Sequence, residues 1–82
     1  MAVILPRNIY EQFSTCLPDK LEEEISRASI RLKLQEPPKA GEELMVYQQD
    51  LNILSGLKYL SQLRKGKLSL EEFNLKVELI TV

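Results

Sequence analysis

The sequence contains no histidine, no tryptophan and only one cysteine in its 82 residues. Histidine is the side chain used most often for general acid–base catalysis, and it completes most cysteine-containing metal sites. We therefore expect a protein that is not an enzyme, with no metal, no other cofactor and no small-molecule substrate. A single cysteine cannot form a disulfide within the chain. Cys16 is accordingly predicted to be a reduced, buried thiol in a cytoplasmic protein.

Neither sign of charge predominates, since 11 basic residues face 12 acidic ones and the net charge is −1. Proteins that bind nucleic acid through its phosphates normally carry a basic excess, so nucleic acid is not the expected partner. No apolar run approaches the roughly 20 residues that a membrane-spanning helix needs, and no positively charged signal-peptide segment is evident. The partner that composition favours is another protein, or a second copy of this chain in a homo-oligomer.

Proline and glycine are few, and they divide the sequence into four helical segments. The strongest break is 36–41, which contains two adjacent prolines and a glycine, and weaker breaks occur at Pro18 and Gly66. Between these breaks, apolar residues recur with helical spacing. We predict an all-α fold, a small bundle of three to four helices around a central helical hairpin, in a single domain spanning 1–82. The expected helices cover about 8–17, 19–35, 42–65 and 69–80.

Two segments also fit a different secondary structure. Apolar and polar residues alternate over 29–34 as they do in a strand, and the stretch 76–82 is rich in β-branched residues. If both were extended, 1–5 could pair with them. The alternative is therefore a small α+β fold with short strands at 1–5, 29–34 and 76–82.

The segment 42–65 carries few charges and an unusually wide apolar surface. Its apolar side chains form two adjacent stripes that together cover an arc of about 180°, whereas an ordinary surface helix shows a narrower one. One stripe holds Val46, Ile53, Leu57 and Leu60, and the other holds Leu44, Tyr47, Leu51 and Leu54. We predict that the second stripe, with Tyr59, contacts the partner, so that the candidate interface is Leu44, Tyr47, Leu51, Leu54 and Tyr59. The alternative is that this stripe packs on the other helices of the same chain.

Two parts of the sequence resemble known families. The residues Tyr47-Gln48-Gln49, then Leu57 and 60–63, resemble the second helix of the small YscE-type co-chaperones of type III secretion. This resemblance implies a helical hairpin that holds another protein before export. The stretch 60–73, with Lys76 and Leu79, is similar to the SHOCT motif, a short helical pair thought to mediate association. Both resemblances imply helices that are presented for protein contact.

The sequence therefore predicts a non-catalytic protein–protein interaction module that acts by helix–helix packing, in the form of a chaperone-like adaptor or assembly factor. The alternative is a small nucleic-acid-binding regulator of the antitoxin or repressor type. Its only support is a short basic cluster, Arg64, Lys65 and Lys67. Binding that weakens steeply with salt would identify such a regulator.

Overall fold

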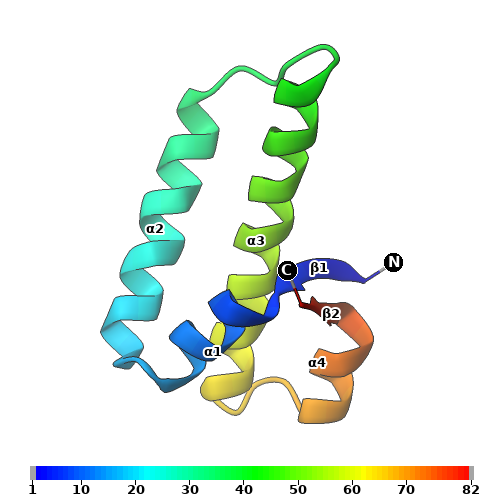
Figure 1. Ribbon diagram of the computed structural model, residues 1–82. Helices are drawn as coiled ribbons and strands as arrows, with labels where there is room; N and C mark the ends of the chain where they lie inside the picture. Colours follow the sequence, from blue (N-terminus) through cyan, green and yellow to red (C-terminus); the bar gives the residue numbers. More distant parts are fainter. Residues whose placement is uncertain (1, 82) are drawn as a thin grey trace.

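The computed structural model describes residues 2–81, which form four helices and one short two-stranded sheet (Figure 1). The protein is predominantly helical. In chain order the elements are β1 (Val3–Pro6), α1 (Arg7–Thr15), α2 (Pro18–Leu34), α3 (Glu42–Arg64), α4 (Leu70–Lys76) and β2 (Val77–Ile80).

The two longest helices, α2 and α3, run antiparallel as a hairpin (Figure 1). The connection at 35–41 contains two prolines, which prevent the helix from continuing, and Gly41, whose φ of +83° is readily adopted only by glycine. The other four elements gather around the end of the hairpin that is remote from this connection (Figure 1). Within residues 2–81, no further element covers the part of the hairpin nearest this connection.

The sheet brings the two ends of the described chain side by side. Strands β1 and β2 pair in parallel, with Val3 opposite Val77 and Pro6 opposite Ile80. Because side chains alternate along a strand, one face of the sheet points into the molecule and the other points outward. The inward face carries Val3, Leu5, Val77 and Leu79, which join the core, and the outward face carries Ile4, Pro6, Glu78 and Ile80.

The core consists of two clusters. The larger lies where all the elements meet and is formed by Leu5, Leu21, Leu57, Leu60, Leu68, Phe73 and Val77. The smaller holds the other half of the hairpin together and is formed by only Ala28, Leu32 and Leu54. The hairpin is thus much better supported at one end than at the other.

The predicted helices agree with the structure except at the end of the chain. The segment 29–34 is helical, so the alternative strand there is wrong. The predicted helix over 69–80 instead ends at Lys76 and continues as a strand, which corrects the all-α prediction. The strands expected in the alternative at 1–5 and 76–82 are observed as Val3–Pro6 and Val77–Ile80, paired with each other. Pairing satisfies backbone groups that neither segment could satisfy alone.

Candidate functional site

Two residues of the predicted interface pack within the hairpin. Leu54 is only 8% exposed and lies in the small cluster with Ala28 and Leu32 of α2. Tyr47 is half-buried and packs against the same cluster. These two side chains stabilise the pairing of α2 with α3, and little of Leu54 is left for a partner to contact.

Of the other three predicted residues, Leu44 and Leu51 follow the same side of α3 as Tyr47, and Tyr59 lies apart. Leu51 is 39% exposed, and Leu44, two turns earlier on the same side of α3, is half-buried. Tyr59 lies further along the helix, where it packs against the large core cluster, and its ring centroid is 5.6 Å from Nζ of Lys76. Four of the five residues therefore follow one side of α3, where Leu54 is buried and Leu51 is the most exposed, and Tyr59 packs elsewhere.

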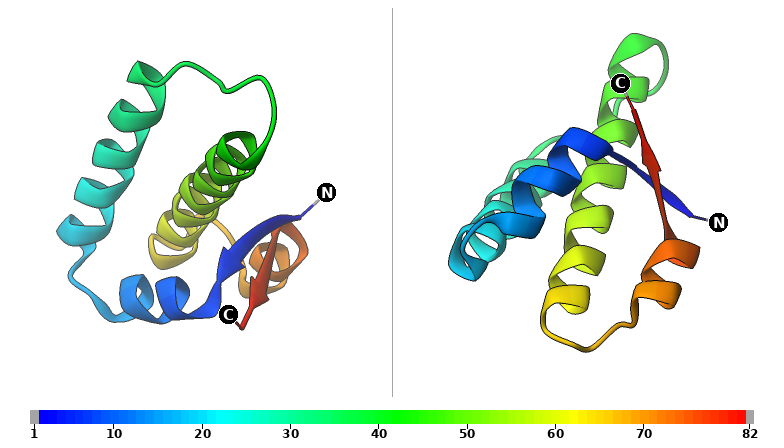
Figure 2. Two further views of the ribbon diagram at one scale, coloured as in Figure 1. Left: turned by 45° about the horizontal axis from the view of Figure 1, so that its top comes forward. Right: turned by 60° about the horizontal axis from the view of Figure 1, so that its bottom comes forward.

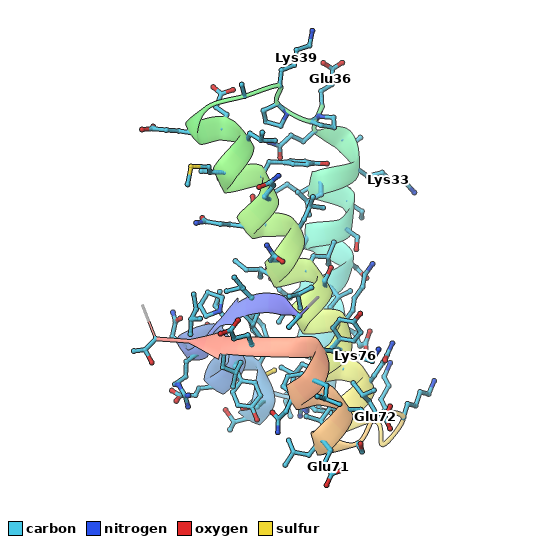
Figure 3. The ribbon with its side chains drawn as sticks, turned by 90° about the vertical axis from the view of Figure 1, so that its right-hand side faces the viewer. Lys33, Glu36, Lys39, Glu71, Glu72 and Lys76 are labelled. Atoms are coloured by element: carbon cyan, nitrogen blue, oxygen red, sulfur yellow. The ribbon has the colours of Figure 1, made fainter. Side chains whose placement is uncertain are left out.

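A different apolar surface lies between α3 and the outward face of the sheet. An open groove of about 380 Å³ lies there and is lined by Ile4, Pro6, Gln49, Asn52, Ile53 and Ile80. Figure 3 shows this side of the molecule, with β2 in front and α3 rising behind and above it. We call this surface the α3–sheet groove. It joins residues from both ends of the sequence to the middle of α3, so helical periodicity alone could not reveal it.

The apolar surface continues along α3 beyond the groove itself. Met45 precedes Gln49 by four residues and Val46 precedes Ile53 by seven, so each pair lies on the same side of the helix. Met45 is 63% exposed and Val46 is 55% exposed. A partner seated in the α3–sheet groove would therefore contact these two side chains as well.

Gly56 sets the distance between α3 and β1. A Cβ atom at Gly56 would lie 3.0–3.3 Å from side-chain atoms of Leu5, which is fully buried. Because glycine has no Cβ, β1 can lie directly on the helix, and this close approach places the outward-facing Ile4 beside Ile53 in the groove wall. The sequence pair Ser55-Gly56 is the signal for this close approach, although it does not say which element approaches.

The charged residues around the groove are mainly acidic, and the exception is the exposed Arg7, which follows the lining residue Pro6. In the first half of α3 the only charged side chains are Glu42, Glu43 and Asp50. On the outward face of the sheet the only one is Glu78, which is exposed. An apolar surface with a mainly acidic border suits an apolar segment flanked by basic residues.

A polar cluster connects the first turns of α2 to the end of α3. The buried Ser61 hydroxyl donates a hydrogen bond to Oε1 of Glu22, and Nζ of Lys65 lies 2.7 Å from the same oxygen. The hydrogen bond from Lys65, followed by that from Ser61, lowers the pKa of Glu22 below its ordinary value. A carboxylate with a lowered pKa is a poor proton acceptor, so this cluster is suited to joining two helices rather than to activating the serine.

Arg64, also at the end of α3, connects this helix to the end of α1 by hydrogen bonds. Its Nη1 donates to the carbonyl oxygen of Phe13 at 2.8 Å and its Nη2 donates to that of Cys16 at 2.6 Å. Cys16 is half-buried rather than fully buried. Of the three residues in the predicted basic cluster, Arg64 and Lys65 therefore have partners within the chain, while Lys67 lies with Lys58 and Lys65 around one shallow hollow that also contains Glu22.

Among residues 2–81, no group of three or more histidine, cysteine, aspartate or glutamate side chains is arranged to hold a metal ion. Within the same part of the chain, no helix is both long enough and apolar enough to cross a membrane. No protein-family model, curated protein sequence or solved structure matches this chain. The resemblances to YscE-type co-chaperones and to the SHOCT motif therefore remain hypotheses.

Proposed function

We propose that this protein is a non-catalytic protein-interaction module that binds another protein chain in the α3–sheet groove. The observation that supports this most directly is the groove itself, where exposed isoleucines from β1 and β2 lie beside Ile53 of α3 and lead to the exposed Met45 and Val46. Contiguous exposed apolar surface with a polar border is characteristic of protein interaction sites.

The driving force for binding would be removal of this apolar surface from water, at about 25 cal/mol per Å² before the costs of association. The groove is suited to this role because its walls are held by the chain's own core. The side chains next to Ile4 and Ile80 in sequence, Leu5 and Leu79, point into the large cluster. Little ordering of the groove would therefore be needed on binding.

A helix is the partner element that the groove best accommodates. Within residues 2–81, no further element covers the part of the hairpin nearest the connection, so an added helix would complete a small helical bundle around the hairpin. This is the kind of contact that a chaperone-like adaptor or assembly factor makes, and we place the activity in the cytoplasm. The small group of Lys58, Lys65 and Lys67, partly neutralised by Glu22, gives little support to the alternative of a nucleic-acid-binding regulator.

Site-specific photo-crosslinking tests this proposal. A photoreactive phenylalanine analogue at Gln49, inside the groove, should give protein adducts in extracts of the cells that make the protein. The same analogue at Glu11, an exposed position on α1, is the matched control and should give few. Equal adduct formation at the two positions, or none at Gln49 with any protein chain including this one, would refute the proposed function.

A further inference from the structure

The side of α2 that faces away from α3 carries two exposed apolar residues. Ala28 and Leu32 are buried against α3, and Ile30, two residues from each, points to roughly the opposite side of the helix. Leu34 follows Ile30 by four residues and lies on the same side. Ile30 is 59% exposed and Leu34 is 82% exposed. These two side chains form an apolar pair that nothing in residues 2–81 covers.

The charges near this pair are mainly basic. Arg27, Arg31 and Lys33 occupy the same stretch of α2, and Figure 3 shows Lys33 extending from the helix into solvent. Two acidic residues also lie in the stretch: Glu24 is 3.7 Å from Arg27 in an ion pair, and Glu23, seven residues before Ile30, is exposed on the same side of the helix. We call this surface, defined by Arg27, Ile30, Arg31, Lys33 and Leu34, the outer face of α2.

The outer face of α2 is thus complementary to the α3–sheet groove. The outer face of α2 is an apolar helix surface with mainly basic neighbours, and the α3–sheet groove is apolar with a mainly acidic border. We propose that the occupant of the groove is the outer face of α2 from a second copy of this chain. This proposal rests on the proposed function. Burial of the apolar residues would provide affinity, and the opposite charges would fix the orientation and speed the encounter.

One copy cannot bring its own two surfaces together. Figure 2 shows α3 lying between α2 and the sheet, so the outer face of α2 and the groove are on opposite sides of the molecule. A copy whose groove is filled still presents its outer face of α2 to another copy. Contacts of this kind, between two different surfaces, produce head-to-tail rings or chains rather than a closed symmetric dimer.

The concentration dependence of the mass is the first test. Sedimentation velocity of the full chain in low salt should show the weight-average mass at least doubling as concentration rises. High salt should reduce this association, because it screens the exposed charges. A chain that stays monomeric at the highest concentration reached in low salt would overturn the inference.

Two single substitutions separate the surfaces. Leu34→Asp alters the outer face of α2 and Met45→Asp alters the surface beside the groove, and both side chains are largely exposed, so folding should be retained by circular dichroism. Each variant alone should stay monomeric. The matched control is Leu75→Asp, because Leu75 of α4 is 79% exposed and belongs to neither surface. This control should associate like the unaltered chain, and a loss of association there would also overturn the inference.

Mixing the two variants gives the most specific result. The Met45→Asp chain keeps an intact outer face of α2 and the Leu34→Asp chain keeps an intact groove, so an equal mixture should form dimers that cannot extend. An interface made of the same surface on both copies would not be restored in this way. A mixture that stays monomeric, or single variants that still associate fully, would contradict the head-to-tail contact.

Charge reversal provides a second route if either aspartate variant fails to fold. The double variant Arg31→Glu, Lys33→Glu should not associate. Mixing it with the double variant Glu42→Lys, Glu43→Lys should restore association.

Crosslinking then distinguishes this inference from the proposed function. If Gln49 crosslinks only to a different protein and the chain never self-associates, the inference fails and the proposed function stands. If Gln49 gives no adduct at all, both fail.

Discussion

At the scale of single residues, small or polar side chains in α3 decide which elements pack on it. Gly56 lets β1 approach because a Cβ there would crowd Leu5, and this gain comes with a cost of about 1 kcal/mol in helix propensity relative to alanine. Ser61 is buried, so its hydroxyl needs a partner, and Glu22 of α2 accepts its hydrogen bond. The roles of both residues depend on other elements, since Gly56 makes room for β1 and Ser61 binds α2.

Glu22→Gln should reveal how this polar cluster contributes to stability as pH changes. The carboxyl titrates near pH 4.5 in the unfolded chain and at lower pH in the folded protein, where Lys65 and Ser61 favour the charged form. Its stabilising contribution is therefore present above about pH 4.5 and is lost as pH falls through the lowered pKa. We expect the variant to have a smaller free energy of unfolding than the parent at pH 7.

Urea denaturation at neutral and acidic pH checks this expectation. The difference in free energy of unfolding between Glu22→Gln and the parent should become smaller as the solution is acidified. The neighbouring Glu23→Gln is the control, because the Glu23 side chain is exposed and makes no hydrogen bond or ion pair with the described residues. A difference for Glu22→Gln that stays constant from neutral to acidic pH would show that the cluster does not stabilise the charged carboxylate.

At the scale of elements, two helix ends are held by different means. The start of α4 is capped locally, since the Ser69 hydroxyl accepts a hydrogen bond from the Glu72 backbone N–H at 3.1 Å. At the end of α1, the local side chains Ser14 and Thr15 both donate to the Glu11 carbonyl, and Cys16 Sγ lies 3.5 Å from the Phe13 carbonyl oxygen. The carbonyls of Phe13 and Cys16 accept stronger hydrogen bonds from Arg64, which is far away in the sequence, at the end of α3. The position of α1 therefore depends on a tertiary contact.

Arg64→Ala should loosen α1 specifically. Removing the guanidinium leaves two partly buried carbonyl oxygens without their donors, and the free energy of unfolding should fall by about 1–2 kcal/mol. Amide exchange in α1 should accelerate more than in α2. Arg31→Ala, at an exposed position, is the control and should change stability by less than about 0.5 kcal/mol. Unchanged exchange in α1 would show that Arg64 does not anchor it.

At the scale of the whole molecule, the hairpin has a strong end and a weak end. The large core cluster and all four smaller elements surround the end of α3 that contains Leu57 and Leu60. The other end is held by the cluster of Ala28, Leu32 and Leu54. The exposed Met45 and Val46 of α3, and Ile30 and Leu34 of α2, lie along this weaker half.

Hydrogen exchange should follow this division. Amides within 46–51 of α3 should exchange faster than those within 57–62, because fewer apolar contacts must break to open them. The comparison is made within one helix at a dilute concentration where copies do not associate. Equal protection along α3 would show that the hairpin opens only as a unit. Slower exchange in 46–51 at high concentration is the added result expected if copies dock there.

Much of the local structure follows from the sequence alone. The prolines and Gly41 end one helix and begin the next, the apolar periodicity identifies α2 and α3, and Ser69 with Glu72 marks the start of α4. These features depend on residues a few positions apart, whose preferences act without the rest of the fold. The predominantly helical character of the protein could therefore be predicted.

The sheet and the groove depend on residues that the sequence keeps far apart. Val77–Ile80 has the apolar content of a helix end and the β-branched content of a strand, and only pairing with Val3–Pro6 selects the strand, because each supplies the hydrogen bonds that the other lacks. The same pairing turns Ile4 and Ile80 outward beside Ile53. Which apolar residues are core and which remain exposed was thus decided by tertiary packing, since periodicity gives the face of a helix but not what covers it.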